Sequence, residues 1–449
     1  MSDETVKLAE FAVGLGFDDI PDVVKNRARD SIADTIATMA FGADFPWSRM
    51  IIDYARAMGS GGNSRIMGDG DAPVQAPFAA LANGSLAHAF ELDGPTSPSS
   101  GVHPGATMVS SGVAMAQELG SSGKDLLAAY IAGAEVMIRI ARATKRSNET
   151  RGFHAPGTTG PFGAAVVCGR LLGFDEDKMI NALGIAGELA CGLVEFSRSG
   201  TGAMVKRLHF GRAAEGGVLA ANLAARGFTG PNTIIEGECG FLRVYCDDYD
   251  MSQLTRELGS DWLTSCISMK RYACHSTGHT PVQAIIDLKR DEGFTADDVE
   301  SVTITVGEKE LSRHNIRDPK DIMIGQYSVP FCVALALIGD ANDPRTFRDA
   351  DVSDPEIHAL IERIRLVPWG SSERPSPIAT VTTVKTRDGR ELKAEVSDFK
   401  GTPDNPFSPE ELREKFLMLT RDRDQAAMSR FFGRVQNIED EQSLEWISV

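Results

Sequence analysis

Apolar residues recur every three or four positions through most of the first 260 residues. In the segment that opens at Ile20-Pro21, Val24, Ala28 and Ile32 follow this spacing, which is typical of a helix with one buried face. Several such segments begin at a proline or an acidic residue and end at a glycine, as helices commonly do. The same pattern predicts further helices over residues 46–58, 77–91, 104–119, 124–143, 160–172, 176–190 and 208–226.

The pattern changes near residue 264. Residues 302–306 alternate β-branched side chains and predict a strand, and residues 378–384 predict a second one. The second strand is followed by Arg387-Asp388-Gly389 and by residues 391–396, which together predict a β-hairpin. Helical segments over 281–292, 327–338 and 355–364 lie between the strands, so we expect an α+β module over residues 265–398.

The helical pattern returns at Ser408, which is followed by Pro409 and two glutamates in the manner of a capped helix start. We therefore predict a mainly α protein. Its large all-helical domain (1–264) is completed by C-terminal helices (399–449), and a smaller α+β lid domain (265–398) is inserted between them. Glycine is abundant, at 44 of 449 residues. Because glycine disfavours helices, its presence within them predicts close contacts between helix backbones.

Composition excludes several classes of partner. The chain has 46 Lys and Arg against 63 Asp and Glu, a net charge of −17, which disfavours nucleic acids and anionic membrane surfaces. Seven cysteines without C-x-x-C spacing indicate a reducing compartment rather than disulfides or structural zinc. The acidic N-terminus does not resemble a signal peptide, and the longest apolar run, 329–338, is too short to span a bilayer. We expect a cytoplasmic protein.

Six of the eight histidines lie in four short segments of unusual composition. In the first, Glu91 and Asp93 close a predicted helix, where they oppose its dipole, and a Pro/Ser/Gly loop then leads to His103 at the next helix start. In the second, His154 lies in a glycine-rich loop before a helix, a position that favours an anion. Solvated acids and surface histidines remain the alternatives for both segments.

The third segment is Lys206-Arg207-Leu208-His209-Phe210-Gly211-Arg212. A positive cluster in so acidic a chain suggests a bound anion, although a solvated basic helix edge is the alternative. The fourth segment contains Lys270, Arg271, Cys274, His275 and His279 near the proposed domain junction. His275 and His279 have metal-ligand spacing but lack the glutamate of H-E-x-x-H. A Cys274 nucleophile is a minor alternative.

Together these segments resemble the MmgE/PrpD family over most of the chain. The most specific pieces are Ala87-His88-Ala89-x-Glu91-Leu92-Asp93, His103-Pro104-Gly105, Gly152-Phe153-His154-x-Pro156-x-x-x-Gly160 and Lys206-Arg207-Leu208-His209-x-Gly211-x-Ala213-Ala214. The resemblance implies a helical domain with a smaller lid, a homodimer, no metal or organic cofactor, and a small polycarboxylate as the substrate. The family's acidic motif is commonly Asp-x-Asp-Asp, whereas this chain has Glu91-Leu92-Asp93-Gly94.

The resemblance also implies roles for particular residues. The residues expected to be catalytic are Asp93, His103, His154, Lys206, His275 and Tyr327, and those expected to bind substrate are Glu91, Arg207, His209, Lys270 and Arg271. A net charge of −17 is compatible with an anionic substrate only if Lys206, Arg207, Lys270 and Arg271 converge on one cleft.

The leading hypothesis is a cofactor-independent lyase that abstracts a proton next to a carboxylate, similar to 2-methylcitrate dehydratase. Alternatives within the family are an epimerase similar to iminodisuccinate epimerase and a decarboxylase similar to cis-aconitate decarboxylase. Outside the family, a metal-dependent hydro-lyase using His275 and His279, or a non-enzymatic binding protein, would also account for these residues.

Overall fold

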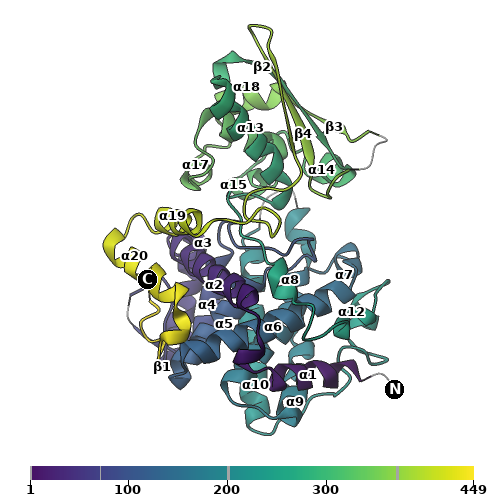
Figure 1. The fold of residues 1–449 in the computed structure, drawn as a ribbon, viewed down its shortest axis with the longest axis vertical. Coiled ribbons are helices and arrows are strands. Elements are labelled where there is room, and N and C mark those ends of the chain that lie inside the picture. Colours follow the sequence, from purple (N-terminus) through teal and green to yellow (C-terminus); the bar gives the residue numbers. More distant parts are fainter. Residues whose placement is uncertain (1–2, 71, 200–202, 371–373, 449) are drawn as a thin grey trace.

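A helical body carries a smaller part built around a β-sheet, which projects from one end of it (Figure 1). The computed structural model describes residues 3–70, 72–199, 203–370 and 374–448. The helices of the body are α1 (Glu4–Gly14), α2 (Asp22–Gly42), α3 (Pro46–Met58), α4 (Ala76–Ala87), α5 (Pro104–Leu119), α6 (Gly123–Ala143), α7 (Ser147–Thr150), α8 (Ala155–Leu171), α9 (Glu176–Glu188), α10 (Val205–Ala225), α11 (Phe241–Tyr245) and α12 (Ser252–Thr255), with the short strand β1 (Ser60–Ser64).

The projecting part combines helices with a four-stranded mixed sheet. It contains α13 (His279–Glu292), β2 (Val299–Val306), α14 (Glu308–Arg313), α15 (Ile322–Gly325), α16 (Val329–Ile338), α17 (Arg345–Arg348), α18 (Pro355–Arg363), β3 (Ile364–Pro368), β4 (Thr380–Thr386) and β5 (Glu391–Val396). The strand order is β3-β2-β4-β5, in which β2 and β3 are parallel and the other pairs are antiparallel. The protein is thus mainly α with a small mixed sheet.

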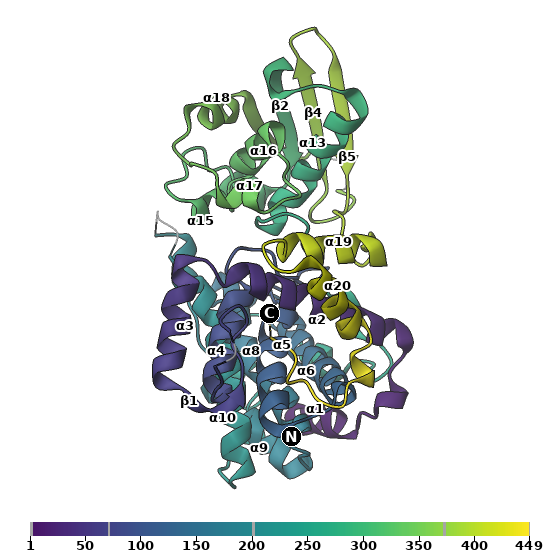
Figure 2. The same cartoon turned by 90° about the vertical axis from the view of Figure 1, so that its left-hand side faces the viewer.

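Two C-terminal helices, α19 (Pro409–Leu419) and α20 (Gln425–Gln436), lie against α2 of the body (Figure 2). The start of α19 is the predicted one: Ser408 and Glu411 form a reciprocal capping box. A buried ion pair between Lys415 on α19 and Asp34 on α2 joins the C-terminal helices to an N-terminal helix of the body. The chain therefore returns to the helical body after it has built the sheet.

Close helix packing explains the glycines of the body. A side chain at Gly211 on α10 would place its Cβ 2.2 Å from the carbonyl oxygen of Leu81 on α4. At Gly217, one turn and a half further on, a Cβ would lie 2.2 Å from that of Ala164 on α8. Because real Cβ atoms do not approach so closely, only glycine allows α10 to pack between these helices. The predicted backbone contacts are confirmed at these positions.

Most predicted elements agree with the structure, with three informative differences. The helix predicted over 77–91 ends at Ala87, because Glu91 has a left-handed backbone (φ 57°) that no α-helix accommodates. The helices predicted from 160 and 208 begin earlier, so that His154 caps α8 and Lys206 lies in the first turn of α10. Strand β3 was not predicted, since it follows α18 without any intervening turn residue.

In the described ranges no helix is both long enough and apolar enough to cross a membrane. All seven cysteines are free thiols.

Candidate active site

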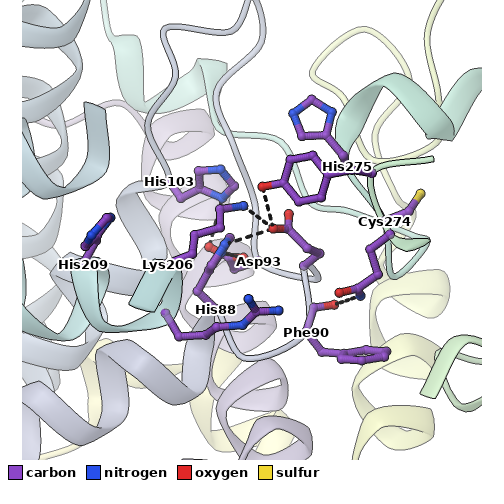
Figure 3. Close-up of polar contacts among 12 residues, drawn as sticks. His88, Phe90, Asp93, His103, Lys206, His209, Cys274 and His275 are labelled. Carbon is purple, nitrogen blue, oxygen red and sulfur yellow. Dashed lines mark hydrogen bonds and ion pairs between the residues drawn. The ribbon is translucent and has the colours of Figure 1, made fainter. Parts of the chain in front are cut away.

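Glu91 lies at the centre of a buried polar cluster to which both parts of the structure contribute. Figure 3 labels His88, Asp93, His103 and Lys206 of this cluster. One carboxylate oxygen of Glu91 accepts a hydrogen bond from the ammonium group of Lys206 on α10. The other accepts from Lys270, at 2.9 Å, and Lys270 belongs to the segment that leads into the projecting part. The Tyr327 hydroxyl, just before α16, lies 3.4 Å from the first oxygen. Two cations and a hydroxyl therefore converge on one carboxylate.

Asp93 is the second buried carboxylate, and two histidines hold it. The His88 Nδ1 lies 2.6 Å from one of its oxygens and the His103 Nδ1 lies 2.9 Å from the other. The second ring nitrogen of His88 lies 3.3 Å from Glu91, so that His88 links the two carboxylates. Since Nδ1 of His103 faces Asp93, the other ring nitrogen, Nε2, is not engaged by this carboxylate. This arrangement orients an imidazole for proton transfer.

The charges of the cluster keep both carboxyl groups ionised. Burial alone would raise the pKa of Glu91, but Lys206, Lys270 and His88 hold that pKa well below its usual value. Burial likewise opposes ionisation of Asp93, whose pKa His88 and His103 nevertheless hold well below the ordinary range. Neither carboxylate is therefore a strong base near neutral pH.

The remaining groups of the cluster are suited to donating protons or accepting them. Burial lowers the pKa of Lys206 to about 8, against the attraction of Glu91. Burial and the nearby Glu91 charge raise the pKa of Tyr327 well above its ordinary value, so that its hydroxyl keeps its proton. Burial lowers the pKa of His103, which leaves this imidazole uncharged and able to accept a proton at neutral pH.

His154 and His209 form a pair beside this cluster. Their Nδ1 atoms lie 2.9 Å apart, so one of them donates and the other accepts. The pKa of His154 is well below its ordinary value because of burial and the neighbouring Lys206 charge. Burial lowers the pKa of His209 to about 4. His209 therefore contacts the His154 ring rather than Glu91.

Three other predicted residues, Arg207, His275 and Arg271, contact groups other than the Glu91 carboxylate. The Arg207 guanidinium donates to the carbonyl of Ala89, at 3.2 Å, and lies over the Trp47 ring. The His275 ring stacks on His314 and lies 5.0 Å from the Tyr327 ring, centroid to centroid.

Arg271 does not join the other three cations. Its guanidinium contacts Asn342 at 2.6 Å and Glu411 at 3.8 Å, and its side chain is one third exposed. Lys270, one position earlier, is almost fully buried against Glu91. Of the four cations expected to converge, Lys206 and Lys270 meet at Glu91 and Arg207 lies on the backbone nearby, whereas Arg271 lies apart.

The described residues do not place a metal site at His275 and His279. The His275 Nδ1 contacts the Thr277 hydroxyl, whereas the His279 Nε2 faces the Cys274 carbonyl. The group close enough to share an ion is instead His88, Asp93 and His103. The 2.6 Å contact of His88 is a direct hydrogen bond, whereas the 2.9 Å contact of His103 is a close nitrogen–oxygen contact without hydrogen-bond geometry. Both distances are shorter than the roughly 3.4 Å between tetrahedral ligands at a bond length of about 2.1 Å.

Two buried side chains in this region were not among the predicted site residues. His88 bridges the carboxylates, and its place in the Ala87-His88-Ala89 motif was the available signal. Gln326 donates to the carbonyls of Phe90 and Ala273. Its only sequence signal was adjacency to Tyr327, since a glutamine carries no distinctive chemistry.

Fold and cluster together define a mainly helical protein with a buried acid–base site shared between its two parts. The chain belongs to the MmgE/PrpD family: the MmgE/PrpD N-terminal domain matches residues 6–254 and the MmgE/PrpD C-terminal domain matches residues 272–436.

Curated relatives carry one activity in their names. Cis-aconitate decarboxylase of Aspergillus terreus (strain NIH 2624 / FGSC A1156) is 35% identical over 301 residues, which are 64% of this chain and 60% of the relative. The match thus spans less than two thirds of that relative's length. Cis-aconitate decarboxylases of Homo sapiens and Mus musculus are 24% and 25% identical, over 90% and 97% of this chain and 85% and 91% of their own lengths.

Proposed function

We propose that the protein is a cofactor-independent lyase that removes CO₂ from a small unsaturated tricarboxylate of the cis-aconitate type. The names of the relatives support decarboxylation over the 2-methylcitrate dehydratase activity that the sequence alone put first. The observation that carries the proposal is the saturation of the Glu91 carboxylate with Lys206, Lys270 and Tyr327. Such a site is rich in cations and acids and poor in strong bases.

Decarboxylation requires this balance of groups. When the C–C bond breaks, CO₂ leaves and the electron pair stays on carbon beside the remaining carboxylates. Ammonium groups stabilise the developing charge, as donors in an oxyanion hole do. One proton must then reach carbon, and Lys206, whose pKa is about 8, and Tyr327 are the nearest acids. The base that dehydration needs is not required.

Dehydration is the second candidate, and the contact between Asp93 and His103 favours it. A carboxylate at Nδ1 leaves Nε2 of the ring as an oriented base. Loss of water would then begin with removal of a carbon-bound proton by His103 and end with protonation of the departing hydroxyl.

We further propose that residues 265–398 act as a lid over this site. In support, Lys270 and Tyr327 reach Glu91 from that part of the chain. Small-angle scattering with and without a bound tricarboxylate tests this directly: closure predicts a smaller radius of gyration with ligand, and an unchanged radius would count against a lid.

A substrate panel tests the reaction. The protein is mixed separately with cis-aconitate, 2-methylcitrate and iminodisuccinate in D₂O without added metal, and NMR follows each mixture. We expect a five-carbon unsaturated dicarboxylate that carries one deuterium on carbon, from cis-aconitate alone. Conversion of 2-methylcitrate with loss of water would favour the second candidate. Absence of turnover and of deuterium exchange for all three would contradict both.

A further inference from the structure

The carboxamide of Gln326 is buried between the two parts of the structure. Its nitrogen donates to the Phe90 carbonyl, at 3.0 Å, and to the Ala273 carbonyl, at 2.8 Å; the dashed line at Phe90 in Figure 3 marks the first of these bonds. Since a carbonyl oxygen only accepts hydrogen bonds, the nitrogen and not the oxygen of the carboxamide must face both. One amide group thus uses both of its hydrogens to join two distant segments.

The main chain of Gln326 makes a third connection. Its carbonyl accepts from the His275 backbone N–H at 2.9 Å, and the next residue is Tyr327. The segments that Gln326 holds are therefore the one that precedes Glu91, the one between Lys270 and His275, and its own. These three segments supply Glu91 itself and two of the groups that meet at its carboxylate, Lys270 and Tyr327.

The backbone at Glu91 is the part of the site that most needs such support. Its φ of 57° is left-handed, a strained conformation that a non-glycine residue keeps only where the surroundings enforce it. The two preceding carbonyls are both held by side chains from elsewhere. That of Ala89 accepts from Trp47 and from Arg207, each at 3.2 Å, and that of Phe90 accepts from Gln326.

We propose that Gln326 is a positioning residue, which holds Glu91 in its left-handed conformation and thereby keeps its carboxylate between Lys206 and Lys270. This proposal rests on the proposed function in one respect: it treats the Glu91 cluster as the place where the substrate reacts. Without the carboxamide, the Phe90 and Ala273 carbonyls lose their shared donor. Glu91 is then free to relax to an ordinary backbone conformation and to leave the two ammonium groups.

The chain offers a matched control in Gln117 on α5. Its carboxamide is also buried and also donates to two backbone carbonyls, those of Leu444 at 3.2 Å and Ile447 at 2.9 Å. These contacts tie down the C-terminal segment and lie outside the Glu91 cluster. Gln326→Leu and Gln117→Leu therefore each remove two bonds from a carboxamide nitrogen to backbone carbonyls, and Gln117→Leu also removes the bond from the Arg65 backbone N–H to its oxygen, at 2.9 Å. Gln326→Met provides an unbranched second variant in case leucine impairs folding.

The proposal predicts different outcomes for the two glutamines. Both variants lose thermal stability, but Gln326→Leu or Gln326→Met lowers kcat for the accepted substrate on the order of 10²-fold, whereas Gln117→Leu stays within about twofold of the parent protein. In the Gln326 variants the acidic limb of the kcat/KM profile also moves to higher pH, because Glu91 loses the ammonium contacts that hold its pKa low.

Crystal structures of the same variants test the positioning role of Gln326 without relying on an activity assay. We expect Glu91 to leave the left-handed region in the Gln326 variants and to keep it in Gln117→Leu. An unchanged Glu91 backbone and unchanged contacts to Lys206 and Lys270 would overturn the positioning role, whatever substrate the protein accepts. An inactive parent protein would instead count against the proposed function.

Discussion

The hydroxyl of Tyr327 lies 3.4 Å from a carboxylate oxygen of Glu91, a residue 236 positions earlier in the chain. This contact joins the projecting part of the structure to the helical body at the point where Lys206 and Lys270 also meet. Burial and the Glu91 charge raise the pKa of Tyr327, so the hydroxyl remains a proton donor across the physiological range.

Tyr327→Phe removes this donor while keeping the ring over which the Lys206 ammonium lies. We expect kcat to fall on the order of 10²-fold with little change in KM, because a general acid acts mainly in the transition state. Steady-state kinetics checks this. Tyr130→Phe is the matched control, since its buried hydroxyl pairs with Ser31 inside the helical body; equal losses of kcat in the two variants would contradict the assignment.

Glu91→Gln keeps the shape of the side chain but removes the charge between two lysines. The Lys206 ammonium loses the partner that supports its protonation, and we expect kcat/KM to fall on the order of 10²-fold or more. Glu135→Gln provides the comparison. Glu135 is equally buried, accepts two hydrogen bonds from Thr264, lies 3.5 Å from Arg139 and has a pKa raised by burial, and none of these contacts belongs to the Glu91 cluster. Full activity of Glu91→Gln would show that the carboxylate is dispensable.

Activity should fall at alkaline pH because Lys206 must carry its proton. Burial lowers its pKa to about 8, so the free enzyme loses this cation as the pH rises through that value. The kcat/KM profile between pH 6 and 10 should therefore show a basic limb near 8. In Lys206→Arg, which stays charged throughout, we expect a lower rate without that limb. A limb that persists in this variant would have to come from another group.

Sequence patterns predicted the helical body well where a helix buries one apolar face, as α3 does. Residues 104–117 of α5 and 31–42 of α2 are buried on all sides, and there the helix starts and stops marked by proline, acidic residues and glycine carried the prediction. Sequence patterns predicted the C-terminal end of α4 poorly. Local propensity allows the helix to continue to residue 91, and only bonds from Trp47, Arg207 and Gln326 to the 89–90 carbonyls turn the chain there. Such tertiary contacts leave no periodic trace in a sequence.

The site residues likewise divide into those that local sequence motifs indicate and those whose partners depend on tertiary contacts. Lys206, Lys270 and Tyr327 were all predicted as site residues, and they meet at Glu91, which was expected to bind substrate. Asp93 pairs with His88 and His103 instead. Two acids that stand two positions apart are indistinguishable by composition, and only the left-handed backbone at Glu91 directs one of them toward the lysines.

Asp93→Asn should reduce stability in a pH-dependent way. The pKa of Asp93 is depressed in the folded protein, so its ionised form contributes stability above the unfolded value of about 3.9 and loses it as the pH falls through the folded value. The difference in free energy of unfolding between the parent protein and Asp93→Asn should be largest at pH 7 and shrink below about pH 4. Urea titrations over this range measure it, and a constant difference would contradict the ionised state assigned to Asp93.

Chelators should leave the activity unchanged. The nitrogen–oxygen contacts of Asp93 with His88 and His103, at 2.6 and 2.9 Å, are shorter than the spacing of ligands around a metal ion, and His275 and His279 face different partners. We expect equal rates before and after dialysis against EDTA, with elemental analysis of the same samples. Loss of activity that Zn²⁺ or Fe²⁺ restores would instead favour the metal-dependent hydro-lyase.

The most direct test of the account is a crystal structure with propane-1,2,3-tricarboxylate, the saturated analogue of cis-aconitate, which has no double bond to delocalise the charge left by CO₂. We predict one of its carboxylates within hydrogen-bond distance of Lys206 or Lys270, and its chain between the Tyr327 hydroxyl and the His103 ring. A ligand bound elsewhere, with the Glu91 cluster unchanged and unoccupied, would contradict the claim that this cluster is where the substrate reacts.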